Sequence, residues 1–154
     1  MQFFLYVEKI MGEMKLQPVI FIPQQKGFDF ELFYKCVEEG LYSEELNDEI
    51  DFLSNIGFIS EFSESGQKVY TINYDFKSKS MPAEELGENE QALIDKLLEQ
   101  GIKTLADTAM IYYFKNYNTR EDEVIKSKIR ELTPDLFNSM AEAHVLYKEL
   151  ETLT

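Results

Sequence analysis

Hydrophobic and polar residues alternate with a helical period between residues 43 and 57. The apolar residues of this stretch recur every three or four positions, at Leu46, Ile50, Leu53 and Ile56. Ser43 precedes them as a suitable N-cap, and Gly57 follows them where helices commonly end in a left-handed residue. The pattern predicts an amphipathic helix that begins after Ser43 and buries these four residues on one face.

Two β-prone segments follow this helix. Phe58-Ile59 and residues 68–72 flank the turn-rich sequence Ser63–Gln67, an arrangement typical of a β-hairpin. A helix, a glycine, a strand, a turn and a second strand are also the second half of a winged helix. We therefore expect a winged-helix-like arrangement here, with the hairpin as its wing.

The first 42 residues predict two helices and an extended segment. Phe3, Val7, Ile10 and Met14 would line one face of a first helix of about 13 residues. Residues 15–25 predict a short second helix, in which Pro18 occupies the first turn and Pro23 ends or kinks the helix. Residues 28–34 alternate between apolar and polar, which favours a strand or an extended segment, and residues 36–42 would form a loop.

The second half of the chain is predicted to be helical. Residues 76–90 lose their periodicity and gain Ser, Pro and Gly, which indicates a linker. Beyond it, an apolar stripe runs from Ile102 to Tyr117, and Thr119 and Thr133 are candidate caps for two further helices. We expect a helix-rich α+β protein with a winged-helix-like part (1–75), a linker (76–90) and a helical C-terminal extension (91–154) that packs on the first part. One compact domain is the alternative.

Bulk composition favours a folded, cytoplasmic protein. The chain has 154 residues, 44% of them hydrophobic and 14% aromatic, which is typical of a globular protein. Its single cysteine excludes an intrachain disulfide framework. The N-terminus lacks the basic region of a signal peptide, and no apolar run reaches the roughly 20 residues that span a bilayer. We therefore expect no membrane partner.

Several short sequences resemble the YwgA-like proteins of bacteria and archaea, a group that in turn resembles the SocA-like Panacea domain. They are Leu16-Gln17, Val19–Ile22, Phe28–Phe30, Leu41–Leu46, Ile50–Leu53 and Gly57–Ile59. The resemblance covers residues 1–75, and residues 105–113 fit more loosely. It implies a winged-helix-like fold and, through the Panacea domain, antitoxin or protein-adaptor roles, with no catalytic residues. Leu41 replaces a proline of the family, and Pro18 and Pro23 interrupt a helix that is usually intact.

The sequence contains no recognisable catalytic, cofactor-binding or metal-binding motif. His144 lies near the edge of an apolar helix face, where a histidine is most often a packing residue, and Cys36 has an apolar context typical of a buried thiol. The chain lacks the glycine-rich sequences that bind nucleotides. We therefore expect a protein that is not an enzyme and needs no cofactor or metal. An enzyme of unrecognised type around His144 or Cys36 is the rival interpretation.

Negative charge is concentrated in one quarter of the chain. The formal net charge is −14, and residues 28–66 hold eleven acids against the single base Lys35, which leaves −10 in this segment. The candidate partner-binding residues are the acids of the predicted helix and hairpin: Glu44, Glu45, Asp48, Glu49, Asp51, Glu61 and Glu64. Such a surface would repel duplex DNA, which DNA-binding proteins attract with Lys and Arg. The alternative is a solvated face that serves solubility.

These observations predict a non-enzymatic, acidic protein-binding module. Its partner would be a basic protein, such as a toxin or a defence or nucleic-acid-binding protein, and its role antitoxin-like, anti-defence or that of a regulatory adaptor. The alternative is a winged-helix transcription regulator that binds DNA through the basic part of the helical tail, as a homodimer. The basic residues of that tail are Lys115, Arg120, Lys126, Lys128 and Arg130.

Overall fold

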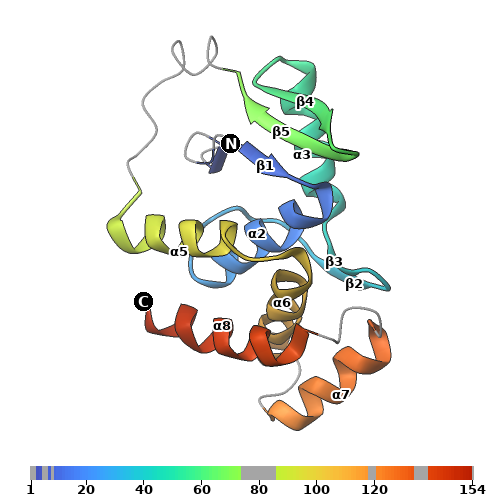
Figure 1. Cartoon of the computed structure of the whole chain (residues 1–154), viewed down its shortest axis with the longest axis vertical. Helices are drawn as coiled ribbons and strands as arrows, with labels where there is room; N and C mark the ends of the chain where they lie inside the picture. Colours follow the sequence, from blue (N-terminus) through green and yellow to red (C-terminus); the bar gives the residue numbers. More distant parts are fainter. Residues whose placement is uncertain are drawn as a thin grey trace.

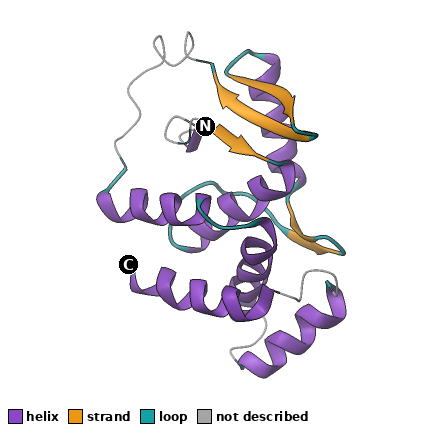
Figure 2. Cartoon of the chain, in the orientation of Figure 1, coloured by secondary structure: helices purple, strands orange, loops and turns teal. Residues whose placement is uncertain are grey.

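The computed structural model describes residues 3–4, 7, 9–73, 86–117, 121–133 and 139–153. This part of the chain forms an α+β protein that is rich in helix, with two small antiparallel sheets (Figure 2). The elements are β1 (Lys9–Met11), α2 (Glu13–Gln25), β2 (Lys35–Val37), β3 (Gly40–Tyr42), α3 (Glu44–Asn55), β4 (Ile59–Glu64), β5 (Gln67–Ile72), α5 (Glu88–Leu98), α6 (Ile102–Tyr117), α7 (Asp122–Leu132) and α8 (Met140–Thr152).

The three-stranded sheet and α3 lie at one end of the molecule, and α6, α7 and α8 lie at the other (Figure 1). Helix α2 lies between these two groups and packs against α6. One cluster of buried apolar side chains includes residues from both halves of the chain, from Phe3 to Leu150. Residues 74–85, which contain most of the predicted linker, lie outside the described residues.

Helix α3 begins and ends as its sequence predicts. The Leu46 N–H donates to Ser43 Oγ at 3.2 Å, which confirms Ser43 as the N-cap. Leu46 and Leu53 are buried, as is Ile50, and Gly57 has a φ of +79° as expected at the end of a helix. The prediction for Ile56 is wrong: it is 42% exposed, because α3 ends at Asn55 and Ile56 is its C-cap, beyond the buried face of the helix.

The predicted hairpin forms, with longer strands and a tighter turn. Strands β4 and β5 pair from Ile59 opposite Ile72 to Glu64 opposite Gln67. Only Ser65 and Gly66 remain in the turn, both with positive φ (52° and 77°), which is the backbone that a two-residue hairpin needs. The predicted five-residue loop at 63–67 is therefore wrong by three residues.

A third strand replaces part of the predicted first helix. Residues 9–11 form β1, which pairs with β5 and places Ile10 opposite Tyr70. Gly12 follows with a φ of +94°, and its N–H donates to the Lys68 carbonyl at 2.8 Å. This conformation strongly favours glycine and ends the strand before α2 begins. A continuous helix through Ile10 to Met14 is thus excluded.

The two prolines of α2 lie inside the helix. Pro18 is its sixth residue rather than part of its first turn, and the helix continues for two residues beyond Pro23. The helix ends at Gln25, where the Lys26 N–H donates to the Pro23 carbonyl at 2.8 Å. A proline removes one helical hydrogen bond, and the burial of neighbouring Val19 and Ile22 offsets that loss.

The segment between α2 and α3 alternates as predicted but is not a strand before Lys35. Its even-numbered residues (Phe28, Phe30, Leu32 and Tyr34) face the core, and Asp29, Glu31 and Phe33 are exposed. The predicted loop at 36–42 is instead the hairpin β2–β3, in which Val37 lies opposite Gly40. Gly40 has a φ of +124°, which allows the chain to reverse there.

The helical half follows its apolar pattern with small shifts. In α6, Tyr112 and Phe114 are buried in the core. The next helix, α7, begins at Asp122 with Glu121 as its N-cap, and Thr133 ends α7. Residues 134–138, which Thr133 was predicted to cap, lie outside the described residues, and so does Thr119. Ile125 and Ile129 form the inner face of α7.

Candidate functional site

Five carboxylates lie on the solvent side of α3. This acidic face consists of Glu44, Glu45, Asp48, Glu49 and Asp51, all of them exposed. The opposite side of the helix is fixed by the burial of Leu46, Ile50 and Leu53. Because these residues occupy the core, the helix has one possible orientation, and it presents the acids to solvent.

Three of these acids have no partner among the residues that the structure describes. Glu44 forms an ion pair with Lys35, whose hydrogen bond and positive charge lower the pKa of Glu44. Glu45 Oε2 accepts a hydrogen bond from the Phe33 N–H at 2.8 Å. Within the described part of the chain, Asp48, Glu49 and Asp51 make no hydrogen bond or ion pair. Their charge is therefore available to a partner.

The two hairpin acids that were predicted to bind a partner form ion pairs within the chain. Glu61 lies 3.2 Å from Lys68 Nζ and accepts a hydrogen bond from Ser54 Oγ at 2.8 Å. Glu64 lies 2.8 Å from Lys9 Nζ, across the sheet. Both carboxylates face a cation of the same chain, so they contribute less negative potential than the acids of α3.

Exposed apolar side chains, which were not among the predicted binding residues, accompany the acids. Phe52 is 56% exposed and lies one turn after Asp48 and Glu49, within the acidic face. Ile56 follows Phe52 by one further turn, and Phe33, beside Glu45, is 73% exposed. Exposed aromatic residues surrounded by charge are typical of protein-binding surfaces. Phe52 could be found from the sequence, because its helical position falls between those of the acids.

A cavity of about 330 Å³ opens beside the acidic face. Its apolar lining comes from the N-terminal segment, α2, the 30–32 segment and α3, and consists of Phe3, Phe4, Ile20, Phe30, Leu32, Leu46 and Leu53. The polar residues that line it are Asp29, Glu45 and Glu49, which are exposed. The cavity thus combines an apolar interior with three carboxylates on its solvent side.

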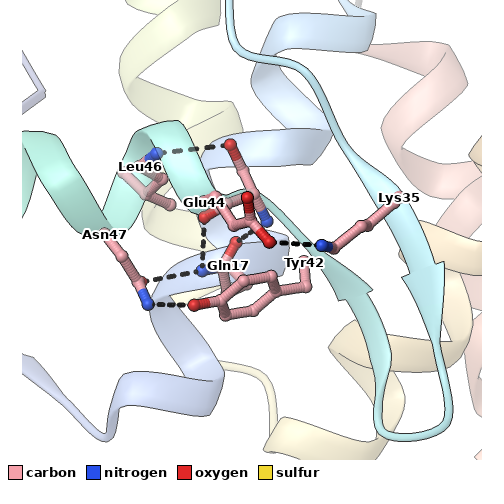
Figure 3. A network of polar contacts seen from close by, with 7 residues as sticks. Gln17, Lys35, Tyr42, Glu44, Leu46 and Asn47 are labelled. Atoms are coloured by element: carbon pink, nitrogen blue, oxygen red, sulfur yellow. Dashed lines mark hydrogen bonds and ion pairs between the residues drawn. The ribbon is translucent and has the colours of Figure 1, made fainter.

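A buried glutamine of α2 holds the start of α3 in place (Figure 3). Gln17 Oε1 accepts a hydrogen bond from the Ser43 N–H at 3.0 Å, and Gln17 Nε2 donates to Asn47 Oδ1 at 3.2 Å. Asn47 Nδ2 in turn donates to the Tyr42 hydroxyl. The network links α2, β3 and the first turn of α3, so it fixes the orientation of the acidic face. Leu16-Gln17 is part of the family resemblance, but its sequence did not reveal this role.

Replacing Gln17 with leucine is expected to lower the free energy of unfolding by about 1–3 kcal/mol, because the buried Ser43 N–H loses its acceptor. Urea denaturation followed by circular dichroism measures the change. Gln100→Leu is the matched control, since Gln100 is partly exposed just beyond the end of α5 and its side-chain amide donates to the backbone carbonyl of Lys96. Equal stability of the two variants would contradict a role for Gln17 in holding α3.

Burial shifts the pKa of both rival catalytic candidates, Cys36 and His144. Cys36 is half-buried beside Met110, and burial raises the pKa of its thiol, which disfavours the nucleophilic thiolate. His144 is half-buried in α8, and burial lowers its pKa although Asp122 opposes this effect. Among the described residues, no group of three His, Cys, Asp or Glu side chains is arranged to hold a metal ion.

The basic residues of the helical tail are largely engaged within the molecule. Lys115 pairs with Asp122 at 3.0 Å, and Lys126 pairs with Glu123 at 3.5 Å. Lys128 lies over the ring of Phe114, 5.6 Å from its centroid. Arg120 lies outside the described residues. None of the helices in the described ranges is long and apolar enough to cross a membrane.

Comparison with known proteins adds one similarity. The chain is similar to the uncharacterized protein YwgA of Bacillus subtilis (strain 168), with 29% identity over 131 residues, which covers 79% of this chain and 74% of that protein. This finding supports the expected similarity to YwgA-like proteins. No family model matches the chain, and neither does any solved structure.

Proposed function

We propose that this protein is a non-enzymatic binding module that engages a basic protein through the acidic face of α3. The observation that carries the proposal is the exposure, on one helix, of three carboxylates without partners in the described chain beside exposed Phe52. Charged residues around an apolar centre both steer a partner of opposite charge and bury apolar area on binding. A face that served only solubility would have no need of the phenylalanine.

The order of elements around α3 supports a more specific version of this proposal. Helix α3, Gly57 and the hairpin β4–β5 follow one another as the recognition helix and wing of a winged helix do. We infer a winged-helix-like, Panacea-related module whose recognition surface has become acidic, in an antitoxin-like, anti-defence or regulatory adaptor role. An acidic recognition helix suits a protein partner that itself binds nucleic acid, because it offers that partner's basic surface a substitute for phosphates.

The test is affinity purification from a lysate of the source organism, with tagged wild-type protein and the triple variant Asp48→Lys, Glu49→Lys, Asp51→Lys. A control with the same change in charge carries lysine at three exposed acids elsewhere: Glu88, Glu99 and Glu131. We expect a basic protein that co-purifies with wild type and control and is lost with the triple variant. Identical partners for all three proteins would contradict the proposal. Specific binding of duplex DNA that depends on Lys126 and Lys128 would favour the transcription-regulator alternative.

Neutralising Asp48 and Glu49, as Asp48→Asn with Glu49→Gln, is expected to leave stability unchanged or raise it by less than about 1 kcal/mol. Asp48 follows Glu44 by four residues, and Glu49 follows Glu45 likewise. Like charges at this spacing cost a helix about 0.2–0.5 kcal/mol per pair. Thermal denaturation at low salt measures the change, and Glu131→Gln is the control. A clear loss of stability would mean that these acids have structural partners.

A further inference from the structure

The cavity beside α3 adds a specific anchor to the proposed binding surface. We propose that it receives one apolar side chain from a peptide segment of the partner, with an arginine or lysine of that segment on Glu45 and Glu49. This inference rests on the proposed function and names the chemistry that the surface recognises. It commits to a partner segment that combines a positive charge with an aromatic or branched apolar residue.

The lining of the cavity determines what enters it. Seven apolar side chains form the interior, and its volume of about 330 Å³ lies near the lower end of the range for ligand sites. Such a space has room for one large apolar side chain, since a cavity of about 150 Å³ already holds benzene. Burial of that side chain provides affinity in proportion to its apolar area, and the fixed shape of the lining selects its size.

The carboxylates at the cavity determine the charge of the occupant. Glu49 makes no hydrogen bond in the described chain, and Glu45 uses Oε2 for the Phe33 N–H, which leaves its Oε1 available. Both residues line the cavity together with Asp29. A cation next to the apolar side chain would therefore meet three carboxylates, and a guanidinium group would bind one of them with two hydrogen bonds.

The extent of the surface favours a peptide over a small amine. From Glu45 to Phe52 the helix covers about 10 Å at about 1.5 Å per residue, and the Phe33 N–H donates a hydrogen bond to Glu45. A small molecule in the cavity would leave both phenylalanines uncovered. A second copy of this chain is disfavoured, because a symmetric pairing would bring the acidic faces of two chains of net charge −14 together.

The experiment is selection of random 12-residue peptides displayed on phage against the immobilised full-length protein. Selected peptides are then synthesised, and their affinity is measured by fluorescence anisotropy. Two variants test the site: Leu32→Trp, which fills the cavity from a half-buried position, and Glu49→Gln, which removes a carboxylate. Leu132→Trp and Glu131→Gln on α7 are the matched controls, since both residues are exposed and far from the cavity in sequence.

We expect peptides that combine Arg or Lys with a large apolar residue. Leu32→Trp should weaken their binding about tenfold or more, and Glu49→Gln about three- to tenfold at low salt, with both controls within about twofold of wild type. If Leu32→Trp fails to fold, replacing the apolar residue of the peptide with alanine makes the same test on the wild-type protein.

Each of the other possible outcomes contradicts one part of the proposal. Basic peptides that bind equally well without their apolar residue would remove the anchor but leave the proposed function intact. Peptides without positive charge would contradict both. Failure to select any peptide, or binding of 2-phenylethylamine in the cavity as tight as that of the peptides, would overturn the peptide anchor, and affinity purification would then judge the proposed function separately.

Discussion

Replacing Leu53 with alanine is expected to lower the free energy of unfolding by about 2–5 kcal/mol. Leu53 has no exposed surface and lies on the inner side of α3, between the helix and the core. The substitution loses the apolar contacts of the removed atoms and leaves a void. Because Leu53 also lines the cavity beside the acidic face, the void enlarges an existing space that the neighbouring elements already fail to close. Urea denaturation measures the loss.

The adjacent residue is the matched control for this substitution. Phe52 belongs to the same helix and is larger than leucine, but it is 56% exposed. Phe52→Ala is therefore expected to change stability by less than about 1 kcal/mol, since surface substitutions usually have small effects. Equal losses for Leu53→Ala and Phe52→Ala would contradict the orientation of α3, and with it the exposure of the acidic face.

The local sequence was sufficient to predict those structural features that depend only on neighbouring residues. The N-cap Ser43 accepts a hydrogen bond from the N–H of Leu46, only three residues later. Gly57 adopts the positive φ that its position after the helix requires. The alternation of residues 28–34 likewise survives in the structure. Because these features arise from periodicity and backbone preference, they could be predicted from a short stretch of sequence.

Prediction failed for features that depend on contacts between segments distant in the sequence. Phe3, Val7 and Ile10 have helical spacing, yet Ile10 belongs to a strand, because β5 lies about sixty residues later and offers a partner for it. The cavity also cannot be predicted from the sequence, since its lining residues come from four separate segments (3–4, α2, 29–32 and α3) that meet only in the fold. The acids were predictable as a surface, but their partnerships with Lys35, Lys9 and Lys68 were not.

Asp107 is a buried polar residue that the sequence pattern did not predict. It lies within the apolar stripe of α6 and is fully buried. Neither carboxylate oxygen has a hydrogen-bond partner of normal geometry among the described residues. Burial raises the pKa of Asp107 to about 7; the backbone N–H of Ser139, at the start of α8, opposes this rise, and the negative charge of Glu142 adds to it. At neutral pH the fold thus contains a carboxyl group that is poorly compensated when ionised.

Asp107→Asn is therefore expected to stabilise the protein above pH 7 by about 4 kcal/mol, since the pKa rises from 3.8 to about 7 and each unit of pKa shift corresponds to about 1.4 kcal/mol. Between the ordinary pKa of 3.8 and about 7, the folded protein keeps a proton that the unfolded chain has lost. Rising pH therefore favours unfolding through this window, and the contribution is constant above it. Asparagine cannot ionise, so the stability difference between the variant and wild type should grow from near zero at pH 4 to its full value above pH 7.

Urea denaturation at several pH values from 4 to 8 measures this difference. Asp48→Asn is the control, because it removes an exposed carboxylate from α3 and should differ from wild type by less than about 0.5 kcal/mol at each pH. A difference between Asp107→Asn and wild type that is independent of pH would show that Asp107 acts through packing alone. A loss of stability above pH 7 would instead show that the ionised carboxylate is held by the start of α8, where the N-terminal end of the helix favours negative charge.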